Sequence, residues 1–130
     1  MNEACHLRPL CSYAWRFALL LALAACAASA PYRLDAPKVV AGQELAPYAI
    51  HEECVELGPG ERISYRFTSS EPVAFNIHFH DGNAIILPIT RDHATEDSDI
   101  FTADRRQPYC LMWEAGAQGA VIDYRVGRVP

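Results

Sequence analysis

The sequence has little of what nucleic-acid binding or a membrane span requires. Its 130 residues carry 11 Lys and Arg against 16 Asp and Glu, and no basic stretch gathers the cations. A mildly acidic chain without a basic stripe is a poor partner for phosphate backbones, so we expect no nucleic-acid ligand. No apolar run reaches the roughly 18–20 residues that cross a bilayer. Nor does any segment keep a helical period, which points away from a helical fold.

What the chain does have near its start is a short apolar run, residues 17–25, preceded by Arg8 and Arg16. Such a run, too short for a span, is typical of the central region of a secretory signal peptide. Removing it with its flank takes Arg8, Arg16 and Glu3 away and leaves nine cations against fifteen acids, a net charge of −6. We therefore predict that the chain is exported.

Two processing sites compete at the end of this run. Residues 23–26 read Leu-Ala-Ala-Cys, which resembles the lipobox of bacterial lipoproteins, where cleavage precedes a cysteine whose thiol is acylated. Residues 28–30 read Ala-Ser-Ala, which fits the ordinary peptidase but would leave Pro31 first. We favour the first and predict a signal peptide over residues 1–25, a lipidated Cys26 and a membrane-anchored protein on the periplasmic side of the cell envelope.

The rest of the length suits one domain. Residues 26–46 contain two prolines and a glycine with little periodicity and are expected to be a tether or lead-in, although residues 38–40 could pair as a short edge strand. Residues 47–130 are expected to form the domain.

Alternating apolar and polar residues indicate strands over 63–67 and 73–79, separated by a break at 70–72. An Asp-Gly pair at 81–82 predicts a tight hairpin after them. Residues 84–90 are apolar but contain Pro88, which predicts an edge strand or a bulge. The remaining segments are expected to be a solvated acidic loop over 91–99 and strands over 100–103, 108–114 and 120–126. The fold class that follows is all-β, a small antiparallel β-sandwich of six to seven strands preceded by a signal-peptide helix.

With the leader and Cys26 set aside, only Cys54 and Cys110 remain, and an exported domain with this pair is expected to form one disulfide. The bridge would close a loop of more than fifty residues and stabilise the domain by roughly 4 kcal/mol. A metal-thiolate site lacks a neighbouring Cys or His at zinc-finger spacing. A nucleophilic cysteine lacks a recognisable base.

The order of these features resembles a known family. A strand around Cys54 is followed by the Gly-Pro-Gly turn at 58–60, the strand at 63–67 and, near the end, Tyr-Cys-Leu-Met-Trp-Glu at 109–114. Over about residues 50–127 the chain is similar to the GOLD (Golgi dynamics) domain, found in secretory cargo receptors and some lipid-transfer proteins. The resemblance implies an antiparallel β-sandwich, a Cys54–Cys110 disulfide and a non-catalytic interaction module. Cargo receptors continue into a coiled coil and a membrane span, so their trafficking role is not carried over.

Histidines offer a second functional hypothesis. His78 and His80 are two apart on a strand and share one face, Asp81 follows, and His93 lies on the expected acidic loop. Imidazole suits copper and zinc, so these four residues could form a metal site. Surface histidines bonded to neighbours or water are the more common meaning of such a pair. A cupredoxin site is excluded because no histidine follows Cys110.

No catalytic motif stands out. Glu52, Glu53 and Asp123 are scattered acids that are expected to face solvent, and three aromatics are expected in the core or at its corners: Tyr109, Trp113 and Tyr124. The sequence therefore predicts an exported, non-catalytic module without a cofactor that binds a protein or envelope component. The alternative is an extracytoplasmic copper- or zinc-binding protein.

Overall fold

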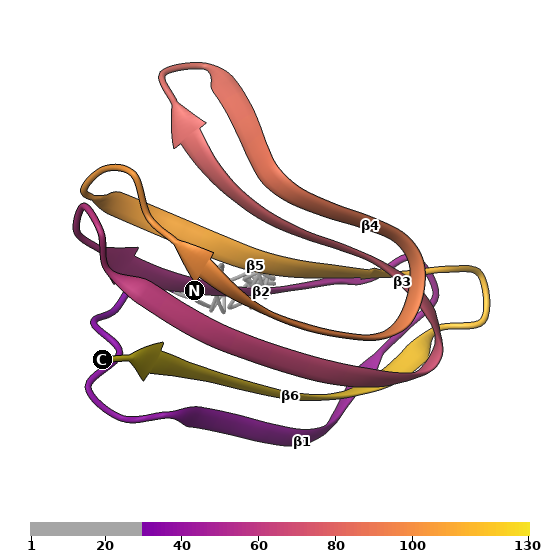
Figure 1. Cartoon of the computed structure of the whole chain (residues 1–130). Helices are drawn as coiled ribbons and strands as arrows, with labels where there is room; N and C mark the ends of the chain where they lie inside the picture. Colours follow the sequence, from indigo (N-terminus) through magenta and orange to yellow (C-terminus); the bar gives the residue numbers. More distant parts are fainter. Residues whose placement is uncertain (1–29) are drawn as a thin grey trace, which may run out of the picture.

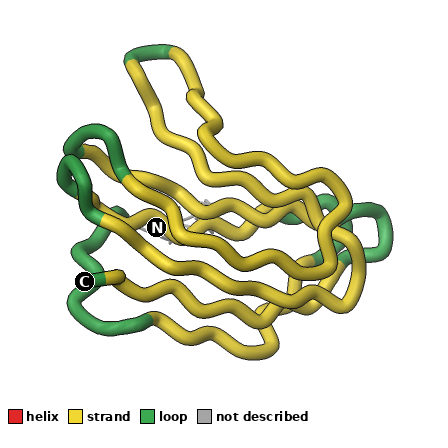
Figure 2. The backbone as a smooth tube through the Cα atoms, viewed as in Figure 1, coloured by secondary structure: helices red, strands yellow, loops and turns green. Residues whose placement is uncertain are grey.

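The computed structural model describes residues 30–130, so the predicted signal peptide and Cys26 lie outside the described residues. This part of the chain is all-β and contains no helix, hence none long and apolar enough to cross a membrane. Its antiparallel strands follow one another with short turns (Figures 1 and 2). They are β1 (Lys38–Leu45), β2 (Ile50–Leu57), β3 (Arg62–Asp81), β4 (Ala84–Thr102), β5 (Gln107–Ala115) and β6 (Ala120–Val129).

A single curled sheet makes two layers because β3 takes part in both. The strand order is β1-β6-β3-β5-β2, with β4 paired to β3. Residues 62–69 of β3 pair with β6, whereas residues 73–78 pair with β5. Figure 1 shows β3 turning between the layer of β1 and β6 and the layer of β5 and β2. The all-β, antiparallel, sandwich-like prediction is confirmed, but the expected break at 70–72 is a bend within one strand.

The core lies between the layers. Trp113 of β5 is fully buried and stacks on Tyr124 of β6 with ring centroids 4.6 Å apart. Because β5 and β6 are not paired with each other, this contact joins one layer to the other. Phe67 and Phe75 complete the aromatic centre, with ring centroids 4.8 Å apart across the bend. Burial of Tyr109, Trp113 and Tyr124 confirms their prediction as core aromatics.

The prediction of a solvated loop over residues 91–99 is wrong, because these residues continue β4. Their backbone pairs with β3, for example Asp97 with Phe67 and Ser98 with Arg66. β4 pairs with β3 alone, so its side chains can be charged and exposed without entering the core. The prediction from Pro88 is confirmed, since the strand lies at an edge and its register shifts between Ile77 and Phe79.

Residues before the expected domain start at 47 also take part in the sheet. Residues 38–45, expected as lead-in, form β1 and pair with β6. Gly42 has φ +68° at a register shift between Val40 and Gln43, so the glycine permits a bulge inside a strand rather than marking irregular chain. The segment before β1 is also attached, because Tyr32 bridges to Val55 and Leu34 is buried.

The predicted disulfide is present. Cys54 and Cys110 lie directly opposite each other on β2 and β5, with their sulfurs bonded at 2.01 Å. The bridge connects residues 56 apart in sequence, which places most of the sandwich inside the loop that it closes.

The disulfide should contribute a large part of the stability. Replacing both cysteines, Cys54→Ala with Cys110→Ala, should lower the free energy of unfolding by about 4 kcal/mol, because the unfolded chain regains the entropy of an open loop. Urea unfolding of the two proteins measures the difference. A loss below about 1 kcal/mol would contradict this entropic account.

Candidate functional site

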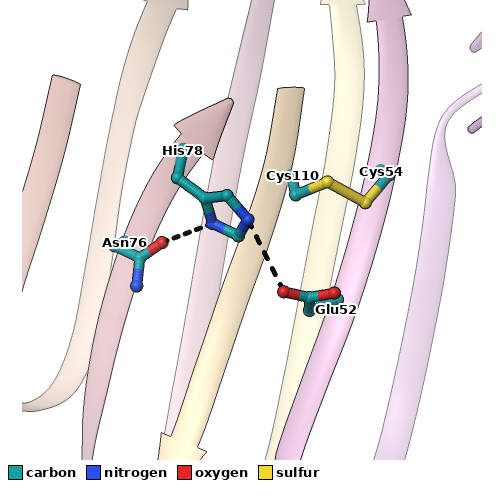
Figure 3. The surroundings of a disulfide bond; sticks show 5 residues. All are labelled: Glu52, Cys54, Asn76, His78 and Cys110. Carbon is teal, nitrogen blue, oxygen red and sulfur yellow. Dashed lines mark hydrogen bonds and ion pairs between the residues drawn. A yellow bond between two sulfur atoms is a disulfide. The ribbon is translucent and has the colours of Figure 1, made fainter. Parts of the chain in front are cut away.

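The predicted histidine site lies on the outer face of the β3-β5-β2 layer, next to the disulfide. His78 of β3 pairs with Cys110 of β5, which in turn pairs with Cys54 of β2. Asn76 and Glu52 stand on the same face, two residues along their strands (Figure 3). The residues with intervening numbers face the core instead, so this row of side chains is separated from the interior by the sheet itself.

His78 donates a hydrogen bond to Asn76 through one ring nitrogen, and its other ring nitrogen faces Glu52. Its side chain is nearly buried, with Nδ1 2.8 Å from Asn76 Oδ1 and Nε2 3.6 Å from Glu52 Oε1 (Figure 3). The amide oxygen can only accept, so Nδ1 carries the proton and donates it. Burial lowers the pKa of His78, although the Glu52 carboxylate opposes this, and nearby His80 lowers it further. The neutral imidazole is therefore the favoured form near pH 7.

The structure brings only part of the proposed metal set together. The rings of His78 and His80 lie 5.5 Å apart, and Asp81 follows at the end of β3 with its carboxylate 3.5 Å from Arg105. His93 lies on β4 at an irregularity opposite Val73 and Phe75, which at 3.3 Å per residue is roughly 15 Å from His78. Over residues 30–130, no group of three His, Cys, Asp or Glu side chains is placed to hold a metal ion.

Glu53 does not face solvent, contrary to the prediction. Its side chain is 1% exposed and points between the layers, where Lys38 Nζ lies 2.6 Å from Oε2. The Tyr124 hydroxyl donates to the same oxygen at 2.8 Å, and His51 Nε2 lies 3.0 Å from that hydroxyl. Because Tyr124 spends its one proton on Glu53, the bond from His51 requires that Nε2 carry a proton. Lys38 comes from β1 and Glu53 from β2, the two strands at the ends of the strand order. The network therefore connects the two layers on the side where β3 does not.

This buried carboxylate is ionised. Burial raises the pKa of Glu53, but hydrogen bonds to Lys38, Tyr32 and Tyr124 outweigh it and hold the pKa below its usual value. Burial and the Glu53 charge raise the pKa values of Tyr32 and Tyr124. The Tyr32 hydroxyl and Glu53 Oε1 do not form a well-aligned hydrogen bond. Tyr32 and Glu53 nevertheless lie close enough to shift each other's pKa. We interpret this site as a structural ion pair in which the contact between Tyr32 and Glu53 Oε1 is the weakest.

The sequence contained a signal for this network. His51, Glu53, Val55 and Leu57 alternate with polar residues or cysteine, so Glu53 shares a face with two core residues. An acid in phase with core positions predicts burial with a partner, because an unpaired charge there would be costly. The partner Lys38 could not be identified, since the segment that contains it was interpreted as lead-in.

A third feature is an apolar surface at the β3–β4 hairpin. Ile85, Ile86 and Leu87 are 55%, 41% and 47% exposed, and they follow the turn at Gly82, whose φ is +60°. Figure 1 shows this hairpin standing away from the sandwich. The sequence predicted an apolar edge strand here, and the structure shows that three of its side chains are exposed. We name residues 85–87 the hairpin tip.

Comparison with protein-family models and with curated proteins finds no match for this chain.

Removing the buried acid should destabilise the domain. Glu53→Ala leaves the buried Tyr124 hydroxyl without its acceptor, whereas Lys38, whose side chain is 38% exposed, can be hydrated, so the variant should cost about 2 kcal/mol in the free energy of unfolding. Glu52→Ala is the matched control, because Glu52 is adjacent but half-exposed, and it should cost less than about 1 kcal/mol. Urea titrations compare the two variants, and equal losses would contradict the role assigned to Glu53.

Stability should also depend on the protonation of His78. The folded pKa lies below the unfolded value near 6.5, so the unfolded chain binds a proton more readily and stability falls as pH drops below about 6.5. His78→Asn should reduce this slope between pH 7 and pH 5, whereas His80→Asn, at an exposed position on the same face, should reduce it much less, because burial is the larger cause of the His78 shift. Thermal unfolding across this range measures both slopes; a steeper slope in His78→Asn would refute the assignment.

Proposed function

We propose that the chain is an exported, lipid-anchored, GOLD-like β-sandwich that binds a protein or another component of the cell envelope and catalyses no reaction. The sequence supports export and anchoring through the apolar run at 17–25 and the lipobox that ends at Cys26. The disulfide suits an oxidising compartment.

The observation that carries the proposal is the hairpin tip. Three consecutive large aliphatic side chains are exposed to solvent, on both faces of a projecting hairpin and outside the buried core cluster. Adjacent exposed apolar groups of this kind are typical of binding surfaces. By contrast, single exposed apolar residues such as Val39 and Val121 are scattered over other strands.

The buried titratable groups support a binding role over a catalytic one. Glu53 is engaged by Lys38 and Tyr124, and His78 donates a hydrogen bond to Asn76. Catalysis needs an acid, base or nucleophile that faces substrate in a cleft. Here the polar atoms are directed at neighbours in the fold. For the alternative, copper or zinc, His78 would offer Nε2, but among residues 30–130 no group of three His, Cys, Asp or Glu side chains is placed to hold the ion.

A photo-crosslinking residue placed at position 87 in the full chain tests the proposal in cells. We expect a discrete adduct from position 87, and its intact mass tells whether the captured component is a protein or a lipid. Position 121 is the matched control, because Val121 is 43% exposed on β6, near the opposite end of the molecule. No adduct from position 87, or the same adducts from both positions, would overturn the proposal.

A further inference from the structure

One end of the sandwich gathers four chain segments beside the hairpin tip. The turn between β2 and β3 is hydrogen-bonded to the loop between β4 and β5, from Gly60 N to Ala103 O at 2.8 Å and from Ala103 N to Glu61 O at 2.9 Å. Near the C-terminus, the Arg128 guanidinium donates to Leu34 O at 3.0 Å in the segment before β1. Figure 1 shows these segments and the hairpin tip on the same side of the molecule. We name this side the arm end, because the N-terminal arm, residues 30–37, packs there.

The hairpin is connected to the arm end through Arg105. This residue lies in the loop between β4 and β5, and its guanidinium is 3.5 Å from the Asp81 carboxylate and 5.3 Å from the centre of the Phe79 ring. Both partners lie in the last part of β3, just before the turn that leads to the hairpin tip. The apolar tip and the loop therefore belong to one continuous surface.

The arm end differs in charge from the rest of the domain. It holds five of the nine cations that follow the leader, together with five acids, and is neutral as a whole: Arg33, Arg62, Arg105, Arg106, Arg128, Asp35, Glu56, Glu61, Asp81 and Asp104. The other four cations face ten acids, a net charge of −6. Over the described residues, Arg33, Arg62 and Arg106 have no carboxylate within ion-pair distance, whereas Arg128 pairs with Glu61. This end would therefore be repelled less by an anionic surface than the rest of the domain would be.

Chain length points to what covers this end. Tyr32 is fixed to β2 by two backbone hydrogen bonds, from its N to Cys54 O at 3.3 Å and from Glu56 N to its O at 2.9 Å. Only residues 27–31 separate it from Cys26. Six steps along a fully extended chain span about 20 Å. An acyl anchor on Cys26 would thus keep the arm end within about 20 Å of the membrane.

We propose that the arm end docks on a phospholipid bilayer. Free guanidinium groups bind headgroup phosphates, and the hairpin tip enters the headgroup region, where apolar side chains are removed from water. This inference rests on the proposed anchoring and names the envelope component as lipid. A protein bound at the same tip is the competing outcome.

Vesicle co-sedimentation of residues 30–130 tests the inference, since this part contains the whole buried core and the disulfide. The probes are vesicles of phosphatidylcholine alone and of phosphatidylcholine mixed with phosphatidylglycerol. We expect binding to the mixed vesicles, weaker binding to the neutral ones, and a decrease with added salt. Absence of binding to both would overturn the inference.

Matched variants locate the surface. Arg62→Gln with Arg106→Gln should weaken binding about tenfold or more, whereas Arg66→Gln with Arg125→Gln, an equal charge change outside the arm end, should have little effect. Ile86→Ser with Leu87→Ser should likewise weaken binding, and Val39→Ser with Val121→Ser should not. Thermal unfolding verifies that each variant folds. Equal losses in matched pairs would refute docking by this end.

The two proposals can fail separately. A protein adduct at position 87 without vesicle binding would reject lipid docking and leave the interaction module standing. A lipid adduct at position 87 together with vesicle binding would support both. Neither adduct nor binding would reject both.

Discussion

The bend in β3 is the constraint on which the rest of the fold depends. One strand pairs with β6 before the bend and with β5 after it, so the two layers share a backbone and cannot slide past each other. Phe67 and Phe75, on either side of the bend, both pack against Trp113, with centroids 5.9 and 5.3 Å from its ring. Strand register and aromatic packing therefore specify the same arrangement, which favours a single native structure.

On the side of the sandwich formed by β1 and β2, no strand of residues 30–130 joins the two layers, and side-chain contacts connect them instead. Lys38 reaches from β1 to Glu53 on β2, and Tyr124 of β6 donates to the same carboxylate. Only the Glu53 carboxylate of this pair is buried, and few alternative registers are tolerated, because a slip would leave that buried charge without its partners. We interpret this network as the feature that aligns the free edges, just as the bend aligns the shared one. Tyr32 extends it to the segment before β1.

Period-two patterning was sufficient to predict the strands with one apolar face, the Asp-Gly pair predicted the hairpin, and the number of cysteines predicted the disulfide. It failed where a strand lies at an edge. Residues 91–99 pair with β3 through their backbone and are not part of the buried core, so their side chains can be charged. In residues 38–45 the alternation is interrupted by the bulge at Gly42. Glu53 was misjudged because burial of an acid depends on a partner from another strand. Which residues of distant strands lie next to each other depends on strand order and register, and these cannot be deduced from the local sequence pattern.

The exposure of the hairpin tip follows from unequal strand lengths. β3 has 20 residues, whereas its pairing with β5 ends at His78 opposite Cys110, so the last part of β3 continues with only β4 beside it. Phe79 is still buried against Tyr109, but the side chains of residues 85–87 on β4 are exposed. A polar tip would be the expected sequence if it met only water. Apolar residues at this place, on the same side of the molecule as a loop with an unpaired arginine, are consistent with a surface that is covered when the protein functions.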